Sequence, residues 1–164
     1  MNAAAQASVQ PSAEVSAALP GAKRAGASRL TVWGFEIYDA TLWVSPGFSA
    51  AEWAAKPLVL ELQYLRRFEG DDIARRSLDE MRRAEPIAPE QATLWLRTMA
   101  QAFPDVKKGD RLTGIYEPGA GVRFLHNGRT TANVRDPQFA RRFFGIWLGP
   151  QSSEPALREA LLGK

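Results

Sequence analysis

Strand-like segments occur in two blocks along this chain of 164 residues, and two helical segments separate the blocks. Within each strand-like segment apolar residues alternate with polar ones, which is typical of a sheet that is buried on one face. The first block covers residues 30–32, 35–44 and 58–65, and the second covers residues 111–116, 121–126 and 129–134. Asn127 and Gly128 join the last two segments, and this dipeptide is the strongest short signal for a β-hairpin.

Helical periodicity replaces the alternation between the two blocks and again at the end of the chain. From residue 71 an apolar stripe with helical spacing runs until Pro86, and Pro89 opens a second helix at a position where its missing N–H costs nothing. Further helices are expected over residues 137–147 and 154–162. Strands and helices that are segregated in this way favour an α+β fold, with helices packed on one face of an antiparallel sheet.

The residue types exclude several classes of site. The chain has no cysteine and a single histidine, His126, so that disulfides, thiolate chemistry and histidine-based metal sites are not expected, and no cofactor is predicted. The net charge of +3 is not gathered with aromatic residues or glycines, so nucleic acid is not an expected partner. The arginines between residues 66 and 97 alternate with acidic residues, which favours a solvated helix face. No apolar run approaches the roughly 18 residues that a membrane-spanning helix needs.

The first 27 residues differ from the rest of the chain in composition. They are rich in Ala, Ser, Gln and Pro and contain no aromatic residue, so they are expected to form a flexible tail before a domain at residues 28–164. The segment also lacks the basic start and apolar stretch of a signal peptide. We interpret it as the N-terminus of the mature protein after removal of a signal peptide, which predicts a periplasmic or secreted protein. The alternative is a native flexible tail on a cytoplasmic protein.

A set of short segments occurs in a characteristic order. The segments are WGFEIYDATLWV at 33–44, LQY at 62–64 with an arginine at 66 or 67, residues 73–77, FPDV at 103–106, GD at 109–110 and FFGIWLGP at 143–150. Together they resemble the bacterial chalcone isomerase-like family from about residue 28 to residue 163. The resemblance implies an open-faced β-sandwich, in which helices cover one face of a curved antiparallel sheet and leave a ligand cleft between the two layers.

The resemblance also carries expectations about activity. Plant chalcone isomerases close a flavonoid ring, and related plastid proteins bind fatty acids through an arginine and a tyrosine. At the positions of the isomerase's threonine, tyrosine and asparagine this chain has Asp39, Ile73 and Glu80, and the catalytic arginine would fall near Ser28 or Arg29. Chalcone isomerase activity itself is therefore not expected.

Five residues are candidates for a ligand site. Arg29 could bind a carboxylate in a bidentate manner, with an exposed arginine at a strand start as the alternative. Tyr38 and Asp39 are adjacent on a strand, so one of them is expected to point inward. Tyr64 and Arg66 would share a strand face as an anion clamp, unless the tyrosine lies in the core and the arginine extends to solvent.

Three functions remain open from the sequence. The leading hypothesis is a non-catalytic binding protein for a fatty acid or a similar small amphipathic acid. The second is an isomerase or lyase that uses Asp39 as acid or base, with Arg29 or Arg66 stabilising an oxyanion. The third is a structural or partner-binding module without a ligand. The sequence makes no prediction of the oligomeric state.

Overall fold

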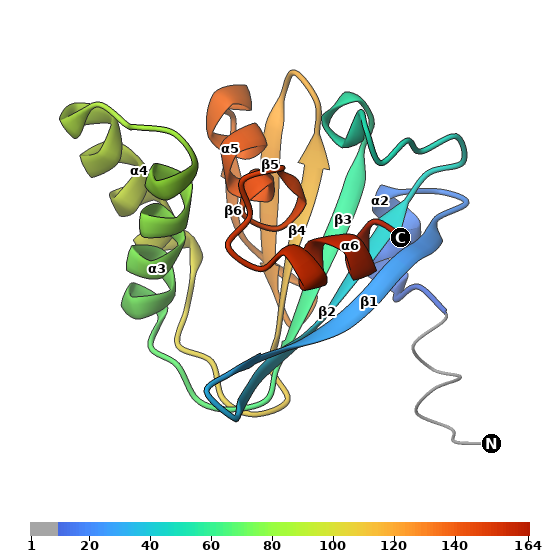
Figure 1. Ribbon diagram of the computed structural model, residues 1–164, viewed down its shortest axis with the longest axis horizontal. Coiled ribbons are helices and arrows are strands. Elements are labelled where there is room, and N and C mark those ends of the chain that lie inside the picture. The colour runs from blue at the N-terminus through green and yellow to red at the C-terminus, as the bar shows by residue number, and fades with distance from the viewer. Residues whose placement is uncertain (1–9) are drawn as a thin grey trace.

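Six antiparallel strands form one sheet in the computed structural model, which describes residues 10–164 (Figure 1). Each strand pairs with the next one along the chain, so the sheet order is the sequence order. The strands are β1 (Lys23–Val32), β2 (Phe35–Val44), β3 (Leu58–Tyr64), β4 (Arg111–Glu117), β5 (Gly121–His126) and β6 (Arg129–Val134). The predicted α+β class and the antiparallel sheet are confirmed.

Four helices pack on one face of this sheet, which we call the inner face. They are α3 (Gly70–Ala84), α4 (Pro89–Ala102), α5 (Pro137–Leu148) and α6 (Pro155–Leu161), and a short 3-10 helix, η1 (Trp53–Ala55), precedes β3. Phe143 of α5 lies at the centre of an aromatic cluster, with ring centroids 5.0–6.4 Å apart among Phe103, Phe124, Phe139, Phe143, Phe144 and Trp147. This cluster holds the helices against the sheet through apolar burial.

The opposite, outer face of the sheet is covered in part by a further helix, α2 (Ala13–Ala18). Val15 and Leu19 are buried there against apolar residues of the sheet, namely Trp43, Val59, Ile115 and Leu125. Polar groups surround this contact: the Trp43 indole N–H donates to Glu61 at 2.8 Å, and Arg111 forms an ion pair with Glu14. Residues 13–19 have only two large apolar side chains, Val15 and Leu19, and the sheet provides a complementary apolar surface for each of them.

The prediction of a flexible tail over residues 1–27 is therefore wrong for residues 13–27, which form a helix and the start of a strand. Besides α2, strand β1 begins at Lys23 and continues through the proposed domain boundary at residue 28. At Gly26 an added Cβ would lie 1.9 Å from the Ala160 carbonyl oxygen, so this part of β1 packs directly on α6. Residues 1–9 lie outside the described part of the chain, and the periplasmic location stays a prediction. Within residues 10–164 no helix combines the length and apolar character needed to cross a membrane.

Candidate functional site: a cavity beneath the first three strands

A cavity of about 460 Å³ lies between the inner face of β1–β3 and helices α3, α5 and α6. Its volume falls within the range of typical small-molecule sites, roughly 300–1,000 Å³. Aliphatic and aromatic side chains form most of the wall, and polar groups are few. The lining residues are Leu30, Val32, Ile37, Tyr38, Tyr64, Phe68, Asp72, Ile73, Arg76, Ser77, Glu80, Ile146, Trp147, Ser152, Ser153, Glu154 and Leu157.

Two buried tyrosines supply polar atoms inside this apolar wall. Tyr38 and Tyr64 are directly opposite each other on β2 and β3, and their rings meet edge to face with centroids 5.5 Å apart. The Tyr38 hydroxyl accepts a hydrogen bond of 2.9 Å from the Trp147 indole N–H, which leaves its own proton available to a ligand. The Tyr64 hydroxyl has no hydrogen-bond partner within residues 10–164, although only 4% of the residue is exposed.

Both tyrosines are held in their neutral form. Burial raises the pKa of Tyr38 to about 12, and it raises the pKa of Tyr64 further above the ordinary value. Each phenol is therefore a hydrogen-bond donor near neutral pH, and neither is a base. An unpaired donor in an apolar site favours a ligand that brings an oxygen acceptor.

Charged groups come to the cavity from α3 and from the segment before α6. Asp72, Arg76 and Glu80 lie on α3, and Glu154 lies just before α6. Asp72 forms an ion pair with Arg75, whereas Arg76 has no ion-pair partner in the described part of the chain. Arg76 thus provides the cavity with an exposed guanidinium that is free to meet an anion.

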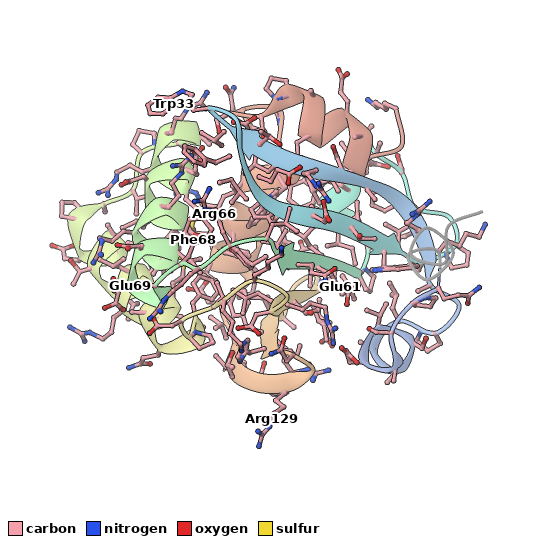
Figure 2. All side chains as sticks on the ribbon, turned by 90° about the horizontal axis from the view of Figure 1, so that it is seen from below. Trp33, Glu61, Arg66, Phe68, Glu69 and Arg129 are labelled. Carbon is pink, nitrogen blue, oxygen red and sulfur yellow. The ribbon has the colours of Figure 1, made fainter. Side chains whose placement is uncertain are left out.

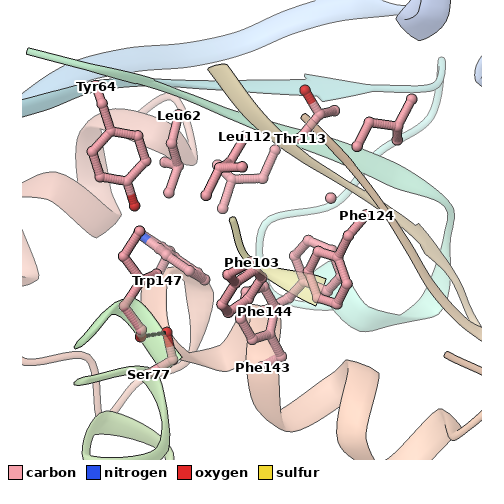
Figure 3. A pocket seen from close by; sticks show the side chains of 14 residues that line it. Leu62, Tyr64, Ser77, Phe103, Leu112, Thr113, Phe124, Phe143, Phe144 and Trp147 are labelled. Carbon is pink, nitrogen blue, oxygen red and sulfur yellow. Dashed lines mark hydrogen bonds between the residues drawn. The ribbon is translucent and has the colours of Figure 1, made fainter. Parts of the chain in front are cut away.

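A smaller space of about 40 Å³ adjoins the cavity and shares four of its lining residues, Tyr64, Ile73, Ser77 and Trp147 (Figure 3). Phe103, Phe124, Phe143 and Phe144 form its deep side. The Ser77 hydroxyl donates to the Ile73 carbonyl at 2.8 Å within α3, so the hydroxyl proton is already used. This deep side is therefore apolar, whereas the charged residues line only the larger cavity.

Of the five predicted site residues, Tyr38 and Tyr64 line the cavity and Arg29 and Asp39 do not. Arg29 and Asp39 are opposite each other on β1 and β2, and Arg29 donates to both Asp39 oxygens at 2.7 and 3.0 Å. Arg29 also pairs with Glu36 at 2.6 Å. Because neighbouring residues of a strand face opposite sides, Tyr38 inside places Asp39 outside. Two carboxylates satisfy Arg29 there, and it is not a ligand clamp.

Arg66 is also absent from the cavity wall. Strand β3 ends at Tyr64 and the chain bends at residues 65–66, so the alternation that would have placed Arg66 beside Tyr64 does not continue. The Arg66 guanidinium instead lies over the Phe35 ring, 4.6 Å from its centroid. The predicted anion clamp of Tyr64 with Arg66 is therefore not formed.

Sequence reasoning missed the contributions of α3 and α5 to the site. The alternation of arginines with acidic residues predicts a solvated helix face for Arg76, and the sequence gives no sign that Trp147 of α5 lines a cavity. A signal for Arg76 was present, since Ile73, Arg76, Ser77 and Glu80 have the i, i+3, i+4, i+7 spacing of one helix face. Ile73 and Glu80, expected at the isomerase's tyrosine and asparagine positions, both line the cavity.

The chalcone isomerase-like family model matches residues 19–163, and the chain belongs to this family. An uncharacterized protein of Haemophilus influenzae (strain ATCC 51907 / DSM 11121 / KW20 / Rd) is 31% identical over 133 residues. That match covers 80% of this chain and 64% of the Haemophilus protein, so the chain spans less than two thirds of that relative's length. The crystal structure of an Arabidopsis thaliana fatty-acid binding protein superposes with a TM-score of 0.65 at 10% identity, and 88% of each chain is covered. At this identity the likeness shows the open-faced sandwich fold.

Proposed function

We propose that the protein binds one small amphipathic molecule, a fatty acid or a similar acid, in the cavity beneath β1–β3 without transforming it. The observation that carries the proposal is the combination of apolar walls around about 460 Å³ with a buried Tyr64 hydroxyl that has no hydrogen-bond partner among residues 10–164. A cavity of this kind binds an acyl chain through apolar contact and orients one polar end by hydrogen bonds. The fatty-acid binding function of the Arabidopsis protein of the same fold supports this ligand class.

The polar end of the ligand would lie between Tyr38, Tyr64 and Arg76. The two phenols donate hydrogen bonds to an oxygen, and the Arg76 guanidinium neutralises a carboxylate. The acyl chain would extend along Ile73 and Trp147 toward the apolar deep side. Glu80 and Glu154 lie near the same end of the cavity and oppose a second negative charge, so a monoacid fits better than a diacid.

An isomerase or lyase that depends on Asp39 is the weaker candidate. Asp39 lies on the outer face of the sheet and is paired with Arg29, so it cannot reach a ligand in the cavity. Both tyrosines of the cavity are neutral, since burial raises the pKa of each. Binding without transformation needs no catalytic acid or base, so it accounts for the cavity with only the residues that line it.

Calorimetric titration with a sixteen-carbon fatty acid tests the proposal. Wild-type protein is expected to bind the acid, and Arg76→Gln should weaken the affinity about three- to tenfold, because the lost charge–charge contact is partly screened by solvent. Arg82→Gln is the matched control: Arg82 is an exposed arginine of the same helix, and neither Arg82 nor its partner Asp79 lines the cavity. No binding by the wild type, or equal loss in both variants, would overturn the proposed site.

A further inference from the structure

The β1–β2 hairpin ends in an exposed aromatic tip, which we define as Trp33, Gly34 and Phe35. Trp33 is 94% exposed and Phe35 is 56% exposed, and they are among the three large apolar residues left exposed within residues 10–164. Figure 2 shows Trp33 at the end of the hairpin, on the edge of the molecule in this view. Two neighbouring aromatic rings that remain in water do not gain the free energy of burial. A second surface that covers them would gain it on binding.

The backbone at the tip adopts a conformation that is unusual for tryptophan. Val32 pairs with Phe35, so Trp33 and Gly34 are the two central residues of the turn, and both have positive φ, 51° and 79°. Such a turn favours Asn or Gly at its first position, because a bulky side chain is strained in the left-handed region.

A second hairpin in the same molecule has the residues that this geometry favours. Asn127 and Gly128 connect β5 to β6 with φ of 49° and 85°, between the paired residues His126 and Arg129. A tryptophan that is both strained and exposed at the equivalent place does not serve the stability of the fold. The comparison therefore points to an interaction outside the chain.

Two exposed arginines, Arg66 and Arg67, follow β3, and Arg66 contacts the tip. The Leu65 amide donates to the Ile37 carbonyl at 2.9 Å, which places residues 65–67 along the start of β2. Arg66 packs on the Phe35 ring, and neither Arg66 nor Arg67 forms an ion pair in the described part of the chain. The nearby acid Glu36 is already paired with Arg29. The tip thus combines aromatic rings with exposed positive charge.

We infer that the hairpin tip, together with Arg66 and Arg67, docks on the surface of an anionic lipid bilayer. Tryptophan is enriched where one end of a side chain is apolar and the other is wet, as at a membrane interface. Arginines next to it gain free energy from anionic headgroups. The tip presents exposed aromatic rings over a few residues of a hairpin turn, and this small apolar area suits shallow insertion into the headgroup region.

The hairpin that carries the tip also forms part of the cavity wall. Leu30, Val32 and Ile37 line the cavity and belong to the same hairpin, within a few residues of Trp33. Docking would bring the wall of the cavity that this hairpin forms close to the bilayer, where an amphipathic ligand could be exchanged. This consequence rests on the proposed function, whereas the docking itself does not, so it is tested without added ligand.

Co-flotation of the full chain with vesicles tests the inference, with phosphatidylcholine alone compared with a mixture that contains phosphatidylglycerol. Binding to the anionic vesicles is expected, and Trp33→Asn should lower the partition coefficient at least about tenfold because the largest buried area is lost. Arg66→Gln and Arg67→Gln should each lower it about fivefold. Thermal unfolding should show Trp33→Asn folded and at least as stable as the wild type, since asparagine suits the turn.

Two matched controls separate the tip from general surface effects. Leu94→Asn changes another exposed apolar residue, 52% exposed on α4, and Arg129→Gln changes an exposed arginine at the opposite edge of the molecule (Figure 2). Both variants should bind vesicles as the wild type does. Absence of wild-type binding, or binding unchanged by Trp33→Asn, would overturn the inference. So would a concentration-dependent dimer in sedimentation that Trp33→Asn abolishes, because the tip would then contact a second copy.

Discussion

Each face of the sheet buries a tryptophan whose indole N–H donates to a side chain of a strand, but the surroundings differ. On the outer face Trp43 donates to Glu61, which also accepts from Ser12 and lies 3.4 Å from Arg111, and α2 packs over the contact. On the inner face Trp147 donates to Tyr38, beside a Tyr64 hydroxyl without a partner and an open cavity. The outer face also has a buried hydroxyl without a hydrogen-bond partner among the described residues, that of Thr113, which lies between Glu61 and Leu125. Only the Tyr64 hydroxyl belongs to a residue that lines the cavity of about 460 Å³, so it is the one available to a ligand.

The largest effect is expected where α2 closes the outer face. Val15→Asp places a carboxylate at a position that is fully buried, and it should lower the free energy of unfolding by about 3 kcal/mol. Denaturant titration followed by circular dichroism measures the change. Ser16→Asp, at the exposed next position of the same helix, should be nearly neutral. Equal stability of the Val15 variant and the wild type would mean that α2 does not hold to the sheet.

A smaller effect is expected from Asp110, which joins the start of β4 to the β5–β6 turn. The Lys107 backbone N–H donates to it at 3.0 Å and, with the Asn127 amide, lowers the pKa of Asp110 to about 2. Because the folded-state pKa is below the unfolded one, this stabilisation is present above about pH 4 and is lost as the pH falls toward about 2.

Asp110→Asn should therefore cost about 1–2 kcal/mol near neutral pH and make the acid loss of stability shallower. Urea midpoints measured across that pH range test this expectation. Asp79→Asn is a suitable control, since Asp79 is an exposed residue of α3. An Asp110 variant with the same acid profile as the wild type would contradict the assignment.

Inside the cavity the two tyrosines should respond differently, and the smallest effect on stability is expected at Tyr64. Tyr38→Phe leaves the Trp147 N–H without its acceptor and should cost about 1–2 kcal/mol. Tyr64→Phe removes a hydroxyl that has no partner in the described part of the chain. The free energy of unfolding should therefore change by less than about 0.5 kcal/mol, while fatty-acid affinity falls several-fold. Chemical denaturation and calorimetry on both variants measure the two quantities. A large stability cost at Tyr64 would show a structural role for its hydroxyl.

Local patterns in the sequence determined the elements and their order from residue 30 onward, but not α2 or the start of β1. The alternation along residues 35–44 and 58–65, the Asn127–Gly128 turn and Pro89 each act through backbone geometry within a few residues, and the structure has a strand, a hairpin and a helix start at these places. The same alternation showed that Tyr38 and Asp39 face opposite sides of the sheet. It could not show which of them faces inward, because that depends on the side from which the helices pack.

Only the tertiary structure decided which charged groups reach the cavity. Arg29 lies outside the cavity because it pairs with Asp39 on the neighbouring strand. Arg66 lies outside it because the chain bends after Tyr64. Arg76 entered it because the rotation of α3 about its own axis turns the face that carries Ile73 toward the sheet. Likewise, the burial of Val15 required an apolar patch formed by four different strands. These outcomes depend on contacts between residues far apart in the chain, and local propensity carries no information about such contacts.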